Sequence, residues 1–441
     1  MKINVGIPIY DEKKGEAIIY LMTEDNITSN VSIDFKKLLS LSNIASKEAV
    51  DFFLFSATIY GIDRFINRRV NSVDGWSREL NVKFPVRNVP KWNKAKAHIE
   101  EMVSFLTGDY WTFEFYDSNF NIPNKLPLEI SFKDNFAKVS LFSGGLDSLI
   151  GVLNFLNDYK DEKVILASHY DGDMKGVRGD QEGLLEILTK IYPNRIVYIP
   201  AIKVTLDNAL NKEKTFRARS ILFIGIAVII ADAKKIDIEV PENGTVSLNY
   251  PLNPSRRSAC STRTTHPNLI NLIQNVWLKL GIPTKINNPF EFSTKGEMVS
   301  RYKGDTLAKE VFLKSNSCGK RRPDQRRGNP DAKHCGVCMP CVYRRAALHT
   351  IGLDKNDQYG DKIMDLDKFL TKKGQDVGAC LEFIGLTLTP EDIKQELMIN
   401  GVKDLLKLDQ YSNVVVRTRL ELINWIKKNG NSYIYNKANL K

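Results

Sequence analysis

Long hydrophobic runs are absent from this chain, and cysteine is scarce. The longest apolar run, residues 220–233, is shorter than the roughly 20 residues that span a bilayer, so it predicts a buried helix. The N-terminus reaches charged residues within a few positions and lacks the apolar core of a secretory signal. Only 6 cysteines occur, four of them clustered, which fits a reduced compartment better than a disulfide framework. We therefore expect a cytoplasmic protein without a membrane segment.

Internal repeats and low-complexity tracts are also missing from the 441 residues, and this length predicts more than one domain. A hydrophobic content of 43% and a charged content of 26% are typical of soluble globular proteins. The net charge of +11 at pH 7 favours acidic partners, which include nucleotides, RNA and acidic proteins. Charge alone does not choose among these partners.

Residues 1–132 are predicted to form a separate N-terminal α+β domain. Trp111, Phe113 and Phe115 alternate along one strand, so we expect their rings to share a face. No catalytic constellation occurs here, and packing and the docking of a partner protein are both open as roles. The strand-like segments are residues 3–9, 15–22, 29–35 and 109–117, and the helical patterns cover residues 46–69 and 92–106.

Residues 138–159 contain the first pattern that points to chemistry. A short apolar strand, residues 139–142, enters a Ser-Gly-Gly turn, and a helix of apolar periodicity leaves it. The first amides of a helix carry the positive end of its dipole, and glycines let a ligand approach the backbone, so the turn predicts a phosphate site. Asp147 would repel phosphate unless Mg²⁺ lay between them. The alternative is an ordinary strand-to-helix turn with capping residues.

The pattern from residue 136 to about residue 288 alternates strands and helices, which predicts a doubly wound parallel sheet. The next strands are expected at residues 164–170 and 195–199, with a helix at about 180–192 between them. Ligands of such sheets bind at the carboxyl ends of the strands. We therefore expect adenine beside the backbone of Ala167 and Tyr170.

Four basic residues are candidates for contacts with an anion. Arg217 and Arg219 precede the apolar helix, where cations oppose the helix dipole, and this mismatch favours a functional role. Arg263 lies in a polar segment that precedes another predicted helix and is a candidate substrate ligand. Lys295, beside Glu297 at a further helix start, is expected to contact phosphate. A solubilising helix start is the alternative for the arginine pair.

The cysteine cluster is the second strong pattern. Four thiolates at the spacings of Cys318, Cys335, Cys338 and Cys341 can close a tetrahedral Zn²⁺ site, which is structural when all four ligands are cysteine. A redox CxxC pair and an iron–sulfur cluster are alternatives. Between the first two cysteines lie many basic residues, which form either a solvated loop or a patch for an acidic chain or RNA. Residues 351–441 are predicted to be a helical extension without chemistry of its own.

The motif SGGLDS at residues 143–148 resembles the loop of the N-type ATP pyrophosphatases, and the Gly-Lys-Ser/Thr ending of a Walker A loop is missing. With the helix that follows Arg219, the STR at 261–263, PFEFSTKGEM at 289–298 and the cysteine motif, residues 138–350 are similar in order to the 7-cyano-7-deazaguanine synthase (QueC) family. The resemblance implies a HUP-like PP-loop fold with a zinc-binding tail over residues 133–350, and ATP, Mg²⁺ and Zn²⁺ as cofactors. It implies that Phe142–Val152 is the ATP loop and that the four clustered cysteines are zinc ligands. Together with the residue patterns, we expect Asp147, Lys295 and Arg219 as catalytic residues and Arg217, Arg219 and Arg263 as substrate ligands. The expected ATP-binding residues are Phe142, Ser143, Gly144, Gly145, Leu146, Asp147, Ser148, Ala167 and Tyr170.

The chain also departs from the housekeeping enzymes of that family. Ala218 and Ser220 replace the family's glycine and asparagine, Thr262 replaces a cysteine, and the N-terminal and C-terminal parts have no counterpart. This architecture is more similar to QueC homologues of anti-phage cassettes, such as the QatC proteins of Qat systems. These relatives imply adenylation of 7-carboxy-7-deazaguanine, its amide coupling to the N-terminal amine of a partner protein, and contacts with other proteins of a defence operon. A free nitrile synthase that uses ammonia, a non-catalytic nucleotide-binding scaffold and direct tRNA modification are the alternatives.

Overall fold

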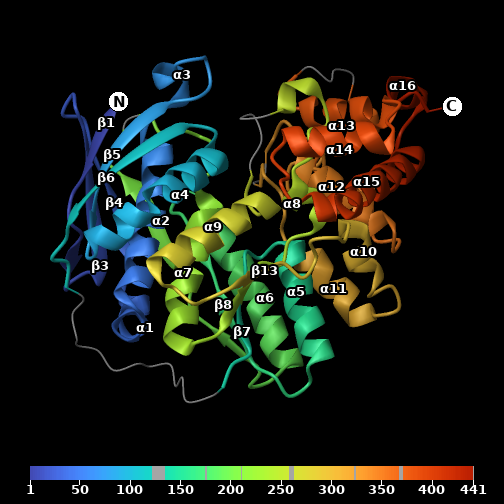
Figure 1. The fold of residues 1–441 in the computed structure, drawn as a ribbon. Coiled ribbons are helices and arrows are strands. Elements are labelled where there is room, and N and C mark those ends of the chain that lie inside the picture. The colour runs from blue at the N-terminus through green and yellow to red at the C-terminus, as the bar shows by residue number, and fades with distance from the viewer. Residues whose placement is uncertain are drawn as a thin grey trace. The chain divides into compact units, whose positions relative to one another are not determined.

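The computed structural model describes residues 1–121, 135–173, 176–209, 211–257, 263–321, 324–366 and 371–440. The chain forms two compact units, each built from separate stretches of sequence. Unit 1 comprises Met1–Ser143, Val152–Val240 and Thr262–Pro289, and unit 2 comprises Gly144–Gly151, Pro241–Ser261 and Phe290–Lys441. The domain boundaries expected at residues 132 and 350 stay a prediction. Figure 1 shows the elements of both units, coloured along the chain.

Unit 1 contains a fully parallel sheet of five strands in the order β10-β8-β7-β12-β13. The chain therefore starts in the middle at β7, moves outward in one direction, and then crosses to the other side of β7. A sheet of this order has its ligand site where the direction reverses, at the carboxyl ends of its central strands. The strands are β7 (Lys138–Leu141), β8 (Val164–Ala167), β10 (Ile196–Tyr198), β12 (Asp237–Glu239) and β13 (Ile286–Asn287). The expected α/β class with a mostly parallel sheet is thus confirmed.

A second, mixed sheet of unit 1 has the strand order β6-β5-β1-β3-β4-β11-β9, with β2 paired to β3. Strand β11 comes from beyond residue 200, yet it pairs antiparallel with β4, and Ser32 and Asn30 of β4 donate hydrogen bonds to the Asp207 carboxylate. The first residues of the chain therefore share one sheet with a later segment. The strands are β1 (Lys2–Val5), β2 (Ile9–Asp11), β3 (Glu16–Thr23), β4 (Thr28–Asp34), β5 (Glu79–Val86), β6 (Tyr110–Asp117), β9 (His169–Tyr170) and β11 (Ile202–Asp207).

The single strand expected over residues 164–170 is wrong, because the chain changes sheets at Ser168. Strand β8 ends at Ala167 in the parallel sheet, and β9 pairs with β11 in the mixed sheet. Ser168 makes the crossing without losing polar contacts: its hydroxyl donates to the Phe142 carbonyl at 2.6 Å, and its own carbonyl accepts from the Ile202 amide at 3.0 Å. A uniform apolar run cannot reveal this change, since both sheets bury it.

Two helices fill the space between the sheets of unit 1 and are buried on nearly every side. Helix α2 (Lys47–Phe65) packs on β4 and β11, helix α7 (Arg219–Lys234) packs on β7 and β12, and the two helices pack against each other. The buried helix expected over residues 220–233 is therefore confirmed. No helix in the described part of the chain is both long and apolar enough to cross a membrane. The other helices wholly within unit 1 are α1 (Leu39–Ile44), α3 (Arg68–Asn71), α4 (Val89–Thr107), α6 (Val177–Ile191) and α9 (Pro267–Leu280).

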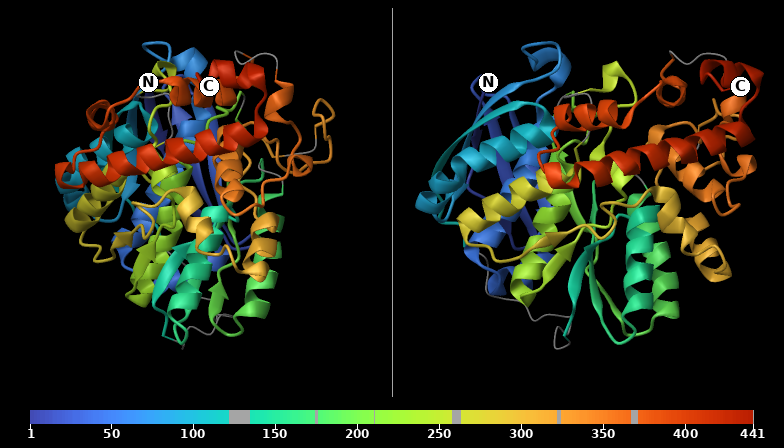
Figure 2. Two further views of the ribbon diagram at one scale, coloured as in Figure 1. Left: turned by 90° about the vertical axis from the view of Figure 1, so that its right-hand side faces the viewer. Right: turned by 45° about the vertical axis from the view of Figure 1, so that its right-hand side comes forward.

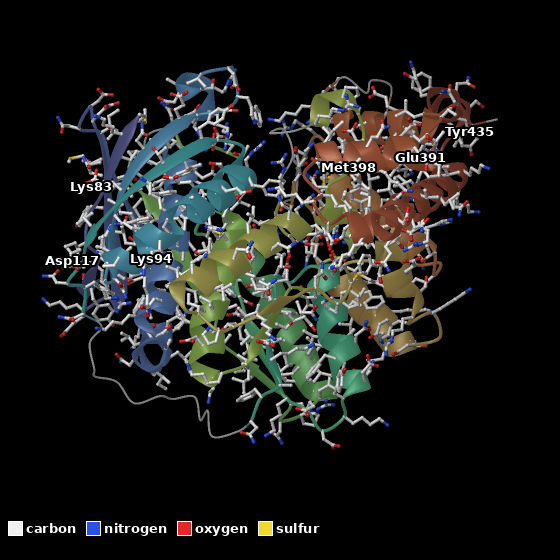
Figure 3. All side chains as sticks on the ribbon, in the orientation of Figure 1. Lys83, Lys94, Asp117, Glu391, Met398 and Tyr435 are labelled. Carbon is white, nitrogen blue, oxygen red and sulfur yellow. The ribbon has the colours of Figure 1, made fainter. Side chains whose placement is uncertain are left out.

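Trp111, Phe113 and Phe115 of β6 share the buried face of the mixed sheet, as predicted. Trp111 stacks on Phe113 and Phe113 on Phe115, each pair with ring centroids 5.9 Å apart. Helix α4 covers them through Trp92, whose ring lies 5.2 Å from that of Phe115. The opposite face carries polar side chains such as that of Lys83, which projects outward from the sheet (Figure 3).

Unit 2 is mostly helical, in agreement with the helical pattern predicted for the C-terminal region, and has a core of its own. Its longest helix, α15 (Leu408–Asn429), runs beside α14 and α12 (Figure 2) and buries Tyr411 and Trp425 completely. Helix α14 turns Glu391 and Met398 to the outside (Figure 3). The remaining helices are α5 (Leu146–Asp158), which begins in unit 2, α8 (Gly244–Leu248), α10 (Lys295–Ser300), α11 (Thr306–Lys314), α12 (Met339–His349), α13 (Gln375–Gly385), α14 (Pro390–Ile399) and α16 (Ser432–Lys437).

Substitution of two glycines by alanine tests the close packing of α2 on α7. A Cβ at Gly225 of α7 would lie 2.8 Å from the side chain of Ser56, whereas a Cβ at Gly183 of α6 meets nothing within 4 Å. Gly225→Ala is expected to lower the free energy of unfolding by about 1–3 kcal/mol because the helices must separate. Gly183→Ala is expected to leave it unchanged or raise it by up to about 1 kcal/mol. Urea unfolding measures both, and equal effects would contradict the close approach.

Candidate functional site

The SGGLDS turn links β7 to α5 and is braced by a segment far along the chain. Gly144 has a φ of 81°, a left-handed conformation that favours glycine. Its carbonyl accepts from the Asn316 amide at 3.0 Å, and the Leu146 amide, at the start of α5, donates to Ser317 Oγ at 3.2 Å. One helix-start amide is therefore already satisfied by a side chain. The backbone around the turn is held from outside rather than by its own hydrogen bonds alone.

Asp147, on the first turn of α5, is paired with the predicted phosphate ligand Lys295. Lys295 Nζ donates to Asp147 Oδ2 at 2.6 Å, and Asn243 Nδ2 donates to the same oxygen at 3.0 Å. Burial raises the pKa of Asp147, but the Lys295 charge and hydrogen bonds with Glu242, Lys295 and Asn243 outweigh it and leave the pKa below its usual value. Among the described residues no donor reaches Asp147 Oδ1, which is buried. This oxygen has the chemistry of a cation ligand.

Glu242 is a second carboxyl group at this place, and sequence reasoning missed it. Burial, followed by the charge of Asp147, raises the pKa of Glu242 well above its ordinary value. A divalent cation bound at this place would satisfy both carboxylates. Gly151, one helical turn after Asp147, lets the segment that leads to Glu242 pack closely on α5. A Cβ at Gly151 would lie 2.4 Å from Pro241. The detectable signal was an acidic residue just past the carboxyl end of a strand.

Lys295 is the first residue of α10, and the local sequence caps this helix. Thr294 Oγ1 accepts from the Glu297 amide at 3.1 Å, and the Glu297 carboxylate accepts from the Thr294 amide at 2.8 Å, which forms a capping box. Asp147, Glu242 and Lys295 follow β7, β12 and β13 along the chain, and these three strands are neighbours in the parallel sheet. The arrangement can bind a divalent cation through carboxylates and a phosphate through the ammonium group.

The predicted nucleotide residues that belong to unit 1 lie on adjoining backbone. The Phe142 amide donates to the Ala167 carbonyl at 2.8 Å. The Gln181 side chain donates to the carbonyls of Ser143 and His169 at 3.4 and 3.2 Å, which ties the start of the turn to the segment that contains Tyr170. The roles of Phe142, Ser143, Ala167 and Tyr170 in binding adenine or phosphate stay predictions.

The three arginines predicted to bind substrate differ in their surroundings. Arg217 is buried, donates to the Thr107 carbonyl at 3.1 Å and lies 4.6 Å over the Trp76 ring. Arg263 donates to the Phe105 carbonyl at 3.1 Å, and its guanidinium lies 4.3 Å over the Phe105 ring. Both guanidinium groups therefore have structural contacts, and their substrate contacts stay predictions. The polar neighbours Cys260 and Thr262 lie outside the described residues, as does Arg322 of the basic loop.

Arg219 has fewer partners. Its guanidinium lies 5.2 Å over the Phe223 ring, and within the described ranges its Nε is buried without a hydrogen-bond partner. Burial lowers the pKa of Arg219. The nearby Asp171 carboxylate is already engaged, because it accepts from Tyr60 and from Arg64, each at 2.5 Å. Arg263 Nε is likewise buried without a hydrogen-bond partner among the described residues, so both Arg219 and Arg263 leave capacity to bind an anion.

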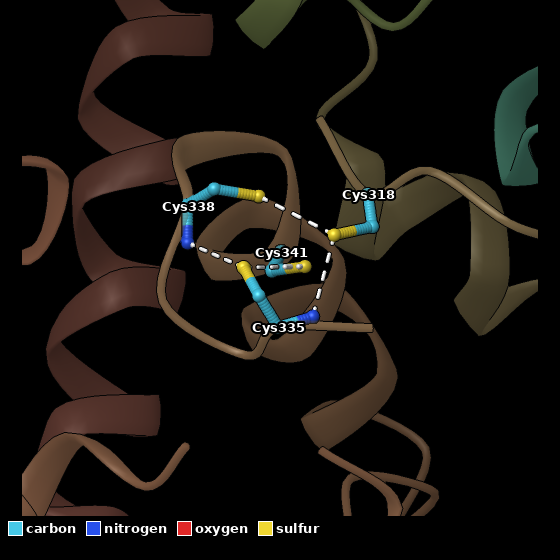
Figure 4. Close-up of side chains that lie close together, drawn as sticks. All are labelled: Cys318, Cys335, Cys338 and Cys341. Carbon is cyan, nitrogen blue, oxygen red and sulfur yellow. Dashed lines mark hydrogen bonds between the residues drawn. The ribbon is translucent and has the colours of Figure 1, made fainter. Parts of the chain in front are cut away.

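The four predicted zinc ligands come together in unit 2 (Figure 4). Their sulfur atoms are buried and lie within 4.8 Å of one another, and the Cys318–Cys338 and Cys335–Cys341 sulfur pairs are each 3.9 Å apart. Sulfurs at the corners of a tetrahedron around Zn²⁺ would be about 3.8 Å apart, given a Zn–S bond near 2.3 Å. The cluster can therefore hold a metal ion such as zinc, as the spacing of the cysteines predicted.

The segment 315–318 connects this cluster to the SGGLDS turn, and we call it the strap. Arg344, on the helix that carries Cys341, donates to Ser315 Oγ at 2.8 Å and to the Phe312 carbonyl at 2.7 Å. The Cys318 amide donates to the Asn316 side chain at 3.1 Å. Since Asn316 and Ser317 contact the turn directly, a metal bound at Cys318 would fix one end of the strap.

No protein-family model matches this chain. No curated protein matches it significantly.

Removal of the metal is expected to loosen the strap. Cys338→Ser should reduce zinc from about one ion per chain to none and lower the melting temperature, because metal binding contributes folding energy. Elemental analysis and thermal unfolding measure both effects. Cys380→Ala is the matched control: Cys380 is fully buried in α13 but outside the cluster, so its zinc content should be unchanged. Stoichiometric zinc in the Cys338→Ser variant would contradict this ligand set.

Proposed function

We propose that this protein is an ATP-dependent carbon–nitrogen ligase of the PP-loop type. It adenylates the carboxylate of a deazaguanine acid and couples the acyl group to the N-terminal amine of a partner protein, in anti-phage defence. The observation that carries this proposal is the convergence of Asp147, Glu242 and Lys295 at the first turn of α5, directly after the Ser-Gly-Gly turn. Two acidic groups and one cation at a phosphate-binding turn suit a nucleotide bound with a metal ion.

The topology supports the same reading. In a parallel sheet of the order β10-β8-β7-β12-β13, ligand sites lie where the strand order reverses, and SGGLDS follows the central strand β7. The sequence lacks the lysine of a Walker A loop, so Lys295 is the candidate to supply positive charge to the phosphates. ATP would place its phosphates at this turn, and Asp147 and Glu242 would hold Mg²⁺.

The proposed reaction has two steps. First, an oxygen of the substrate carboxylate bonds to the α-phosphorus of ATP. The bond between the α-phosphorus and the oxygen that bridges it to the β-phosphorus breaks, which releases pyrophosphate. Then the amine nitrogen bonds to the acyl carbon, AMP departs with the electrons of the carbon–oxygen bond, and the nitrogen loses a proton to solvent. Magnesium would supply charge neutralisation for the departing pyrophosphate.

Lys295, Asp147 and Arg219 have different roles in this reaction. Lys295 leaves its ion pair with Asp147 and stabilises the phosphate oxygens as charge develops on the leaving group. Asp147, once released from Lys295, would hold the metal ion together with Glu242. Arg219 binds the substrate carboxylate, a role its guanidinium fork suits. The protein partner as amine source rests on the resemblance to the anti-phage QueC homologues.

The basic loop offers little support for nucleic acid as the substrate. Arg326 pairs with Asp324 at 2.9 Å, and the Arg327 guanidinium donates to the Lys320 and Ala332 carbonyls. These charges are partly used to shape the loop itself. Salt-dependent tRNA binding would favour the alternative of direct tRNA modification.

The function is tested by incubation of the protein with ATP, Mg²⁺, 7-carboxy-7-deazaguanine and candidate partner proteins. We expect AMP and pyrophosphate, and a partner protein whose mass increases by one deazaguanine acyl group. A free nitrile without a protein adduct would identify an ammonia-dependent synthase instead. ATP binding without AMP formation under any of these conditions would favour a non-catalytic scaffold.

Asp147→Asn tests the central carboxylate. We expect AMP formation to fall about 100-fold or more, because one metal ligand and its charge are lost while shape is kept. Asparagine is chosen over alanine because it fills the same buried volume, and Glu242 can ionise to balance Lys295. The melting temperature serves as the fold control, and Asp161→Asn, at an exposed position beyond the end of α5, should retain full activity. Wild-type AMP formation by Asp147→Asn would refute the assigned role.

A further inference from the structure

We infer that Glu421, on the C-terminal helix α15, is a positioning residue that holds Lys295 in place for the proposed reaction. Its carboxylate accepts from both Thr294 Oγ1 and the Gly296 amide, the latter at 3.1 Å, so it grips the residues on either side of Lys295. The inference rests on the proposed function for the role of Lys295. It gives a positioning role to a helix in which the sequence pattern indicated no functional residue.

The Gly296 contact has no substitute within α10. Amides of the first helical turn have no acceptor inside their own helix, and the capping box uses only the Thr294 and Glu297 amides. Gly296 also makes room for the carboxylate, since a Cβ there would lie 2.4 Å from Glu421 Oε1. The position of this first turn, and with it the Lys295 side chain, therefore depends on α15.

Other residues of α15 contact the segments that bear Lys295 and Glu242. Arg417 donates to the Phe292 carbonyl at 2.7 Å and pairs with Glu297 at 2.7 Å, just before and within α10. Thr418 shares a hydrogen bond with Thr245, in the helix that follows Glu242. A single helix thus reaches both the lysine and the second carboxyl group of the site.

Two further contacts of α15 lie one and two turns earlier. Tyr411 Oη donates to Glu291, and its ring stacks on Phe292 with centroids 5.3 Å apart. Gly244 packs between the Glu291 carbonyl and Val414, where a Cβ would lie 2.3 Å from that oxygen. The loops that bear Glu242 and Lys295 are therefore also packed together along α15.

The protonation of Glu421 gives this arrangement a pH dependence. Burial raises the pKa of Glu421 to about 7, Glu297 adds to the rise, and hydrogen bonds from Thr294 and Gly296 together with Arg417 oppose it. Below that pH the carboxyl group is protonated and is a weaker acceptor for Gly296. Because the folded-state pKa is raised, this group stabilises the fold most below about pH 4.5, and that contribution is lost as pH rises through about 7.

Glu421→Gln separates positioning from stability. The amide resembles the protonated carboxyl group, so at pH 8 the variant should melt no lower than the wild type. Turnover should nevertheless fall about 10- to 100-fold at pH 8, the loss expected when a catalytic group is misplaced. The wild-type rate of AMP formation should rise through about pH 7, and the variant should lack this rise. Gly296→Ala, which displaces the carboxylate from the other side, should reproduce the loss.

Two controls match these variants. Asp409→Asn removes a carboxylate from the exposed start of α15, and Gly304→Ala adds a methyl group where nothing lies within 4 Å. Both should keep the wild-type rate and pH profile. A pH profile of Glu421→Gln that superimposes on that of the wild type would overturn the inference.

Hydrogen exchange of the Gly296 amide tests its hydrogen bond to Glu421 without any substrate. In Glu421→Gln this amide should exchange about ten-fold faster at pH 8, because it loses a charged acceptor. Unchanged exchange would overturn the inference even in an active enzyme. If the wild type forms no AMP with any acid, the proposed function fails, whereas the exchange result still shows whether Glu421 holds the residues around Lys295.

Discussion

The buried ion pair between Lys295 and Asp147 is the interaction on which the candidate site depends. Two carboxyl groups and one ammonium group are brought out of water at the start of α5, and such groups are costly unless they compensate one another. The Lys295 ammonium group compensates the charge of one carboxylate. A divalent cation bound by the two carboxyl groups would add positive charge, and the phosphates of a nucleotide would supply the negative charge that rebalances the site.

Sequence reasoning was most successful where the pattern is local. The Ser-Gly-Gly turn, the central parallel strands, the buried helix α7 and the cysteine cluster each follow from spacing or periodicity over a few residues. It failed where identical patterns have two outcomes. The apolar run 164–170 looks the same whether it stays in one sheet or changes sheets at Ser168, and the pairing of β11 with β4 joins residues far apart in the chain.

The composition of the site shows the same limit. Asp147 was identified because its carboxylate would repel a phosphate at the turn, and Lys295 because its charge opposes the dipole of α10. Their pairing explains why both charges are tolerated. Glu242 was missed because its one signal, a place just past the carboxyl end of a strand, is not accompanied by any motif. Glu421 lies 125 residues beyond Gly296, on a helix of ordinary amphipathic character, and no local rule connects them.

The way unit 2 is assembled explains why distant segments must support the site. Gly144–Gly151 and Pro241–Ser261 are short pieces inserted among residues of unit 1 along the chain, and fixing each residue costs about 1–2 kcal/mol of backbone entropy. Pieces of this length bury too little apolar surface to offset that cost alone. The strap supplies hydrogen bonds to the first piece, and α15 supplies them to the second and to the loop of Lys295. A chain that ended after the cysteine cluster would keep the residues of the reaction and lose the contacts that hold two of them in position.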